Sequence, residues 1–348
     1  MFGDLPMAQK RVTFNDIARY TGFSKTTVSR FFNRPETLTK EHRQTIQNAL
    51  DTLGYRQNKM GRNLARGSTE CVGIIMPNSY NYYYMEMLSQ VLSTFDTFGY
   101  KFMAFTSDGK KDNETRFIQE LLAYQVEGLL VFSHTLPSRY LADLPIPVVS
   151  VEREDEFISS VNCDNYMGAL QAASLLAKHK CDILFHVNNP VAKNIPAYQR
   201  ITGFRDFCEE QHLRYEILIK NMGNRDATMN VQLSSLFQTL EAVYPNERKG
   251  IFFSTDTAAN TFLKLLIRKY HTLPDTYRLV GFDGSFLGSQ AIYSISSIGQ
   301  QIDKISHEAL SLLFDQIRSF RQTGIKPEPV HKVITPILLR RETTELYD

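Results

Sequence analysis

Residues 12–33 read VTFNDIARYTGFSKTTVSRFFN, and this stretch decides the fold of the first part of the chain. Thr13, followed three residues later by Asp16, forms the pattern of a capping box at a helix start. Gly22 marks the end of that helix, and Ser24 can cap a second helix after a short turn. Two helices joined by a tight, glycine-containing turn predict a helix-turn-helix, whose second helix lies in the major groove of DNA.

The predicted second helix carries side chains that suit DNA recognition. Lys25 and Arg30 are long hydrogen-bond donors, Thr26 offers a hydroxyl, and Arg30 can pair bidentately with guanine. Thr27 and Ser29 can bind phosphate oxygens. The alternative interpretation is an ordinary three-helix bundle with basic residues on its surface. The caps, the turn and the local charge favour DNA binding.

The charge of the chain is distributed unevenly. The whole sequence has 39 Lys and Arg against 37 Asp and Glu, a net charge of +2. Residues 1–66 hold 12 basic and 5 acidic residues, a net charge of +7, so the remainder carries −5. A third helix is predicted from Thr39 to Gly54, followed by a polar, basic linker at 55–70. A small basic head on a larger acidic body indicates that the head binds a polyanion.

The composition argues against several classes of protein. No apolar run approaches the ~18 residues of a membrane-spanning helix, and residues 1–9 lack the apolar stretch of a signal peptide. The four cysteines show neither CxxC spacing nor metal-type clustering with histidine, so we expect free thiols, no metal site and a cytoplasmic protein with no membrane partner. Walker A, GxGxxG, GxSxG and HExxH motifs do not occur in the sequence, so we predict neither an enzyme nor a cofactor.

From Cys71 onward, short apolar runs alternate with helical segments. This alternation predicts βαβ units, which build a parallel sheet with helices on both faces. The predicted strands are 72–76, 102–105, 128–132, 148–151, 183–187, 215–219, 250–253 and 279–282, and the predicted helices are 85–98, 115–125, 166–178, 201–211 and 257–270. We therefore predict an α/β body of two similar, doubly wound lobes, with a ligand beyond the carboxyl ends of the strands.

A group of tyrosines follows the first predicted strand. Tyr80, Tyr82, Tyr83 and Tyr84 come soon after Asn78. Aromatic faces pack well on the apolar faces of sugars, and a neighbouring asparagine can meet sugar hydroxyls. The alternative is that these tyrosines pack the core. Four tyrosines in five positions cannot all face inward, so we expect at least one of them to line a ligand cleft.

Residues 12–33 closely resemble the N-terminal signature of the LacI/GalR family of bacterial repressors, V-T-x-x-D-[IV]-A-x-x-[AT]-G-[VF]-S-x-x-T-V-S-R-x-x-N. The resemblance extends over nearly the whole chain and implies a body similar to a periplasmic sugar-binding protein. The fold expected is an all-α head and a two-lobed body of doubly wound parallel sheets. The expected domains are a helix-turn-helix domain at 10–57, a hinge at 58–70, a first lobe at 71–163 with 300–324, and a second lobe at 164–299 with 325–341.

The resemblance assigns DNA-binding residues position by position. Lys25 and Thr26 fall where the family places its base-reading pair, and Arg30 falls on another recognition-helix contact. Leu64 matches the leucine that the hinge helix wedges into the minor groove, although Gln57 stands where the family usually has proline. The full predicted set is Thr13, Ser24, Lys25, Thr26, Thr27, Ser29, Arg30, Asn33, Asn58, Arg62, Leu64 and Ala65.

Effector-binding residues are carried over in the same way. Arg200, in YQRITGF, matches the family's R-x-x-G-[FW] arginine, whose guanidinium suits hydroxyls, carboxylates or phosphates. Asp283 matches another ligand position, although an Asp-Gly pair also forms turns. Asp256 can instead cap the helix that follows it, with Thr255 pointing inward. The full predicted set is Asn78, Tyr80, Tyr82, Tyr83, Tyr84, Glu152, Arg153, Arg200, Thr255, Asp256, Asp283 and Gln300.

These features lead to a functional hypothesis. The resemblance implies a transcriptional repressor that binds a palindromic operator as a homodimer. A small carbohydrate or sugar phosphate between the two lobes would control its affinity for DNA. The alternative is a global regulator of carbon metabolism that a partner protein switches as co-repressor. The partners expected are operator DNA, a small-molecule effector and a second copy of the chain.

Overall fold

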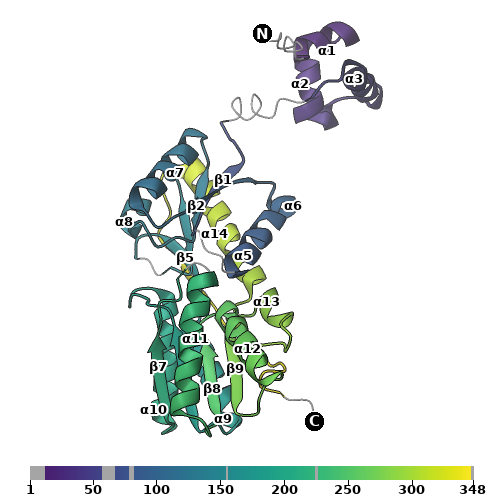
Figure 1. Ribbon diagram of the computed structural model, residues 1–348. Helices are drawn as coiled ribbons and strands as arrows, with labels where there is room; N and C mark the ends of the chain where they lie inside the picture. Colours follow the sequence, from purple (N-terminus) through teal and green to yellow (C-terminus); the bar gives the residue numbers. More distant parts are fainter. Residues whose placement is uncertain (1–11, 57–66, 78–81, 154–155, 224–225, 346–348) are drawn as a thin grey trace, which may run out of the picture. The chain divides into compact units, whose positions relative to one another are not determined.

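The computed structural model describes residues 12–56, 67–77, 82–153, 156–223 and 226–345 (Figure 1). The chain forms two compact units, residues 1–68 and 69–348. No helix among the described residues has the length and apolar character needed to cross a membrane.

The first unit is a bundle of short helices around a small apolar core. Its α-helices are α1 (Phe14–Thr21), α2 (Lys25–Asn33) and α3 (Lys40–Leu53), with a 3₁₀ turn at Pro35–Thr37. Thr13 and Asp16 form the predicted capping box, and Gly22 ends α1 in the left-handed conformation that favours glycine. Ile17, Val28 and Ile46 are fully buried at the centre. The predicted head is therefore confirmed at the level of its helices.

The body contains two six-stranded sheets. The first sheet has the strand order β11-β5-β4-β3-β1-β2, and all its strands are parallel. Its strands are β1 (Cys71–Pro77), β2 (Lys101–Ser107), β3 (Gly128–Val131), β4 (Val148–Val151), β5 (Ser159–Cys163) and β11 (His331–Ile334). Its helices are α5 (Tyr82–Ser93), α6 (Phe95–Phe98), α7 (Lys111–Ala123), α8 (Ser138–Ala142) and α14 (Ile302–Thr323).

The second sheet has the order β12-β10-β9-β8-β6-β7, in which only β12 runs antiparallel to its neighbour among the described strands. Its strands are β6 (Ile183–Asn188), β7 (Tyr215–Ile219), β8 (Lys249–Phe253), β9 (Tyr277–Asp283), β10 (Ser296–Gly299) and β12 (Ile337–Leu339). Its helices are α9 (Asn165–Lys178), α10 (Gln199–Glu210), α11 (Asp226–Val243), α12 (Asp256–Tyr270) and α13 (Phe286–Ser289), with a 3₁₀ turn at Pro196–Tyr198.

The chain crosses between the two sheets three times. It leaves the first sheet after β5 and returns after β10, where α14 packs on β3, β4 and β5. Figure 1 shows α14, drawn in yellow, among the blue elements of the first sheet. Gly128 in β3 permits this packing, because a Cβ there would lie 2.8 Å from the Ile317 side chain. The third crossing separates β11 from β12.

The last part of the chain differs from the sequence-based expectation. We predicted residues 325–341 in the second lobe, but β11 pairs with β5, from His331 opposite Ser160 to Ile334 opposite Cys163. Only β12, beyond the third crossing, joins the second sheet. The reason is tertiary, because β11 pairs along β5 as the outermost strand and Ser160 Oγ lies 2.9 Å from His331 Nδ1.

Candidate functional site

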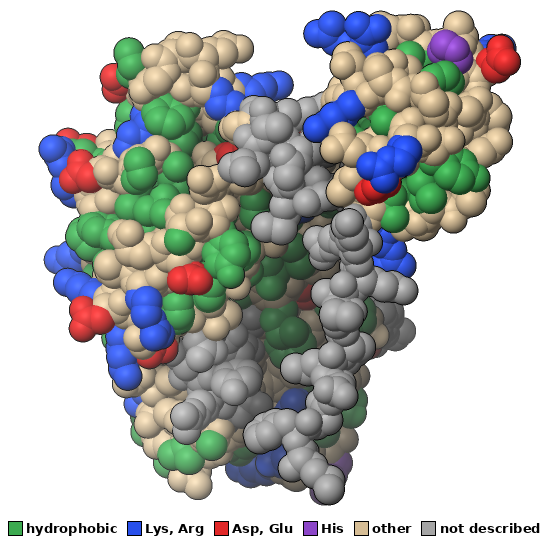
Figure 2. All heavy atoms as spheres, turned by 90° about the horizontal axis from the view of Figure 1, so that it is seen from above, with side chains coloured by type: hydrophobic (Ala, Val, Ile, Leu, Met, Phe, Trp, Pro, Cys, Tyr) green, Lys and Arg blue, Asp and Glu red, His purple; other side chains and the backbone are tan. Residues whose placement is uncertain are grey.

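The exposed face of α2 is the candidate DNA-contacting surface. Lys25, Thr26 and Arg30 are exposed on this helix, whereas Val28 is fully buried against the other helices. Side chains three and four residues apart share a helix face, so Thr26 and Arg30 project together. Lys and Arg side chains stand out on the surface of this unit in Figure 2.

Two of the predicted DNA-binding residues, Thr13 and Ser24, also cap helices. Thr13 Oγ1 donates to Asp16 Oδ2 at 2.6 Å, and Thr27 N donates to Ser24 Oγ at 3.1 Å. Asn33 Nδ2 donates to the Ser29 hydroxyl at 3.2 Å along the same helix. A capped helix start presents free backbone N–H groups and a positive dipole end, both of which suit a phosphate. The predicted residues outside the described part of the chain are Asn58, Arg62, Leu64, Ala65, Asn78 and Tyr80.

A buried polar cluster lies at the carboxyl ends of strands in the body. Glu152 directly follows β4, Asp283 ends β9 and Gln300 follows β10. All three side chains are at least nine-tenths buried. Glu152 and Asp283 both have positive φ, 55° and 115°, a conformation that costs energy outside glycine and that clusters at functional sites. Gly284, which follows the end of β9, also has a positive φ, 69°.

Arg200 reaches the cluster because α10 packs very closely on α9. A Cβ at Gly203 would lie only 2.6 Å from the Tyr166 backbone oxygen, so glycine is needed for the two helices to approach. One turn earlier, the Arg200 guanidinium lies over the Phe282 ring at 3.6 Å and donates from Nη1 to the Ser254 carbonyl at 2.7 Å.

Asn165 links Glu152 to Arg200. Its Oδ1 accepts from Arg200 Nε at 2.7 Å, and its Nδ2 donates to Glu152 Oε2 at 3.1 Å. The other Glu152 oxygen, Oε1, accepts from Cys163 N at 2.5 Å. Asn165 begins α9 immediately after the chain leaves the first sheet, so this hydrogen-bonded chain spans elements of both sheets at a crossing point.

Asp283 and Gln300 form a second, incompletely bonded pair. Gln300 Nε2 donates to Asp283 Oδ1 at 2.8 Å, while Asp283 Oδ2 and Gln300 Oε1 are buried and accept no hydrogen bond from the residues that the structure describes. Buried polar atoms are almost always hydrogen-bonded, so two such acceptors side by side indicate a place for an outside donor.

Burial controls the protonation of this cluster. It raises the pKa of Glu152, although Arg200 and the two hydrogen bonds oppose the change. Burial also raises the pKa of Asp283 well above its usual value, the charge of Asp256 adds to this effect, and Arg200 opposes it. The pKa of Tyr84 rises to about 12 because the ring is buried near the carboxylates of Glu152 and Asp283. Tyr83 lies in the same group, with its ring 5.3 Å from that of Tyr84.

Three predicted effector residues serve other contacts, and a fourth is exposed. Thr255, not Asp256, caps α12 by accepting from Ala258 N, so the predicted capping role of Asp256 is wrong. The Asp256 carboxylate is buried and accepts from Ser285 N, Ser285 Oγ and Ser297 Oγ at 2.6–2.9 Å. Arg153 donates to the carbonyls of Ser133 and Leu136, which holds the loop after β3. Tyr82 is exposed on α5.

Sequence reasoning missed Asn165, Ser254 and Phe282, which hold the Arg200 guanidinium in place. An asparagine directly after a buried strand was the available signal for the first of them. No three His, Cys, Asp or Glu side chains in the described ranges group as a metal site requires.

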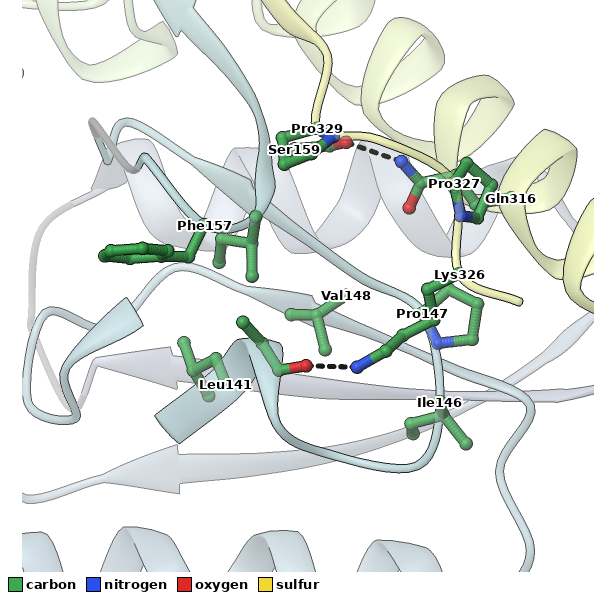
Figure 3. Close-up of a pocket in the computed structure, with 12 residues that line it drawn as sticks. Leu141, Ile146, Pro147, Val148, Phe157, Ser159, Gln316, Lys326, Pro327 and Pro329 are labelled. Carbon is green, nitrogen blue, oxygen red and sulfur yellow. Dashed lines mark hydrogen bonds between the residues drawn. The ribbon is translucent and has the colours of Figure 1, made fainter. Parts of the chain in front are cut away.

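A small pocket elsewhere on the body does not suit an effector. It has a volume of about 60 Å³ and lies between α8, β4 and the segment that follows α14. Figure 3 shows the Lys326 side chain crossing it beside Pro147 and Val148, and its Nζ donates to the carbonyls of Ala142 and Leu144. Ligand sites usually measure roughly 300–1,000 Å³, and this pocket already holds a lysine.

Two family models match the chain. The model "Bacterial regulatory proteins, lacI family" matches residues 13–58, and the model "Periplasmic binding protein-like domain" matches residues 172–344. The matched residues include α1 to α3 in the first unit and most of the second-sheet elements in the body.

Curated relatives cover nearly the whole chain. The ribose operon repressor of Halalkalibacterium halodurans is 28% identical over 96% of this chain and 97% of its own length. The sucrose operon repressor of Streptococcus mutans is 28% identical over 87% of this chain and 92% of its own length. The catabolite control protein A of the same species is 27% identical over 87% and 90%, respectively.

Solved structures share the fold. The lac repressor dimer bound to operator and the anti-inducer ONPF aligns with a TM-score of 0.78 at 18% identity, over 96% of this chain and 99% of the other. A periplasmic binding protein/LacI transcriptional regulator from Alkaliphilus metalliredigens, complexed with D-xylulofuranose, aligns with a TM-score of 0.69 at 24% identity, over 79% of this chain and 99% of the other.

Proposed function

The chain belongs to the LacI/GalR family of bacterial transcriptional regulators, and from that premise we propose that it is a sequence-specific repressor controlled by a small carbohydrate or sugar phosphate. In this proposal it is a cytoplasmic DNA-binding protein and not an enzyme. The observation that carries the proposal is the pairing of a capped helix-turn-helix with a buried polar cluster at the ends of strands.

The proposed DNA contacts come from α2 and the helix starts near it. Thr26 and Arg30 would read base edges in the major groove, because they lie on the exposed side of α2 opposite Val28. Lys25 would join them from the exposed first position of the helix. Thr13, Ser24, Thr27, Ser29 and Asn33 would contact phosphates. One recognition helix reads only a half-site, so two heads related by a twofold axis would bind a palindromic operator.

An exposed apolar surface supports the proposed homodimer. Met85 on α5 and Phe286 on α13 are 64% and 66% exposed, respectively. Phe286 N donates to Glu86 Oε1 at 2.7 Å, which brings these two helices together. Tyr82, Leu92 and Phe95 extend the exposed apolar surface along α5 and α6. Large exposed apolar patches usually mark protein interfaces, and a self-complementary patch suits a second copy of the chain.

Charge introduced on this surface tests the homodimer. We expect the double variant Met85→Glu, Phe286→Glu to sediment as a monomer, because each interface would have to bury four uncompensated carboxylates. Val231→Glu is a matched control, since Val231 is 66% exposed and its helix α11 packs on α12. Analytical ultracentrifugation decides the question. A wild-type monomer, or equal disruption by the control variant, would rule this surface out.

The proposed control is a difference in effector affinity between two arrangements of the lobes. Glu152 follows a strand of the first sheet, Arg200 belongs to α10 of the second lobe, and Asn165 connects them at a crossing of the chain. A ligand held by both side chains would favour one lobe arrangement. If DNA favours the other arrangement, the effector weakens the binding of DNA, and DNA weakens the binding of the effector by the same factor.

Gel shift with genomic fragments tests the function as a whole. We expect a specific complex that weakens steeply as salt rises, because Lys and Arg contacts to phosphate release counterions. Binding that is absent for all fragments, or insensitive to salt, would refute the proposal. Operator binding by the purified protein, with release by a sugar, would exclude the alternative of a partner-dependent regulator. The similarity to catabolite control protein A favours testing that alternative.

A further inference from the structure

One carboxylate holds the chain at the point where it enters the body. Thr69 is the first residue of the second unit, and β1 begins two residues later at Cys71. Glu127, which directly precedes β3, accepts with Oε1 from Thr69 N at 2.6 Å and from Glu70 N at 3.1 Å. Hydrogen bonds from two consecutive backbone N–H groups to one carboxylate oxygen fix the direction in which the chain leaves β1 towards the head.

The backbone at this point has an unusual conformation. Glu70 has a φ of 52°, in the left-handed region that favours glycine. Its carbonyl accepts from Lys101 N at 2.8 Å, and Thr69 Oγ1 donates to the Gln125 carbonyl at 2.6 Å. A residue other than glycine keeps such a conformation only where several contacts hold it, and such residues cluster at functional sites.

The same carboxylate contacts the last turn of α14. Glu127 Oε2 accepts from Arg321 Nη2, and the Glu127 side chain is only 11% exposed. Tyr100 belongs to this group, because its ring lies 4.4 Å from that of Phe314 on α14. Burial raises the pKa of Tyr100 to about 12, and the charge of Glu127 adds to this effect. Helix α14 begins two residues after Gln300 and is about 33 Å long, so it connects the buried polar cluster to Glu127.

We propose that Glu127 is a positioning residue for DNA binding, whose carboxylate fixes where the chain leaves the body and, through Arg321, ties that point to α14. The inference rests on the proposed function, in which two heads bind one palindromic operator. When both chains leave the body at fixed points, the second head meets its half-site at a high effective concentration, and looser chains lower that concentration. Unrelated DNA imposes no half-site spacing, so the contribution of Glu127 should appear with the operator alone.

Two substitutions at position 127 test the anchor. Glu127→Gln keeps an oxygen that can accept from Thr69 N and Glu70 N, whereas Glu127→Met removes it. In Glu127→Met we expect the ratio of operator affinity to unrelated-DNA affinity to fall about tenfold, and in Glu127→Gln to stay close to wild type. Fluorescence anisotropy at fixed salt, well below the Tm of each protein, measures both affinities. Wild type should also discriminate against an operator with one base pair inserted between its half-sites, and Glu127→Met should discriminate less.

Glu241→Met is the matched control for a loss of stability alone. Glu241 is a carboxylate of the second lobe, 18% exposed, that accepts from three side chains: Lys269, Tyr270 and Tyr277. The control should lower the Tm of the body but leave the affinity ratio and the spacing preference unchanged.

A second pair of variants tests the connection to α14. Arg321→Met should lower the affinity ratio, although less than Glu127→Met, because the hydrogen bonds to residues 69 and 70 remain. Arg318→Met is its control, since Arg318 pairs with Asp315 on the same helix. Equal ratios in these two variants would overturn the role of α14.

Hydrogen exchange measures the anchor directly. The amides of Thr69 and Glu70 should be protected in wild type and Glu127→Gln and should exchange rapidly in Glu127→Met, while the β1 amides stay protected in all three proteins. Unchanged exchange or an unchanged affinity ratio in Glu127→Met overturns the inference, and so does an equal fall in Glu241→Met. These outcomes leave the repressor proposal standing, because wild type still binds its operator. A wild-type protein that binds no operator refutes the repressor proposal itself.

Discussion

Operator affinity is expected to fall about thirtyfold or more when Arg30 is replaced by alanine. Arg30 is exposed on the face of α2 opposite the buried Val28, where a bidentate contact to guanine is available. Losing one such contact costs about 1–3 kcal/mol, and a dimer loses it in both half-sites. Fluorescence anisotropy with a labelled operator at fixed salt measures the change.

Arg30→Lys is the matched variant for this prediction. Lysine keeps the positive charge but cannot form the planar bidentate contact, so binding to unrelated DNA and its salt dependence should stay near wild type. Affinity for the operator should still fall. If Arg30→Ala weakens operator and unrelated DNA equally, Arg30 contacts phosphate only and does not read a base.

Asp256→Ala is expected to destabilise the body by about 3 kcal/mol or more. The Asp256 carboxylate is buried and accepts from Ser285 N, Ser285 Oγ and Ser297 Oγ, so alanine leaves these donors without a partner. Each buried polar group left unsatisfied costs about 1–3 kcal/mol. In a unit of this size such a loss lowers the Tm by roughly 5 °C or more, which differential scanning calorimetry detects.

Asp283, the carboxyl group that interacts with Asp256, provides a comparison for this prediction. Asp283 is also buried, but one of its oxygens has no donor among the described residues, and burial raises its pKa well above the usual value. Below the pKa of the unfolded chain both states carry the proton, so Asp283→Asn and wild type should be similarly stable near pH 4. As the pH rises, the unfolded chain ionises first, and wild type should lose stability relative to the variant. Asp256→Ala should be the less stable protein throughout the range from pH 4 to 8.

The pKa of Asp256 is raised, as is the pKa of Asp283. Burial raises its pKa to about 6, although the three hydrogen bonds oppose this. Its contribution to stability is therefore largest below pH 4 and decreases as the pH rises through about 6. A wild-type Tm that increases from pH 4 to 6 relative to Asp283→Asn would contradict the raised pKa of Asp283, and one that increases relative to Asp256→Ala would contradict the raised pKa of Asp256.

Local signals made the head predictable. The capping box at Thr13, the glycine at 22 and the cap at Ser24 act within a few residues of the chain, and each is found where the sequence predicts it. Strands β1, β3 and β4 were predictable for a related reason. They are buried on both faces, so they read as continuous apolar runs that need no tertiary information.

Elements with polar sequences were not predictable in this way. Strand β5 reads SSVNC, yet every one of its residues is buried. Its serines are satisfied by distant groups, because Gln316 Nε2 donates to Ser159 Oγ at 2.5 Å and Val330 N donates to the same oxygen at 2.9 Å. Such partners exist only after α14 and β11 have docked. Residues 331–334 were expected in the second lobe for the same reason. Their pairing with β5 in the first sheet also depends on contacts that form only in the folded body.

The sequence by itself determined the helix-turn-helix, the alternation of strands and helices in the body, and the family, because these depend on short-range patterns. The sequence motifs around Arg200 and Asp283 also predicted these two residues as effector-binding positions. Only the tertiary structure decided that Asn165 joins Arg200 to Glu152, that Asp256 is fully hydrogen-bonded, and that Asp283 is not. The physical reason is that a buried carboxyl group takes its role from the donors around it, and folding brings those donors from remote parts of the chain.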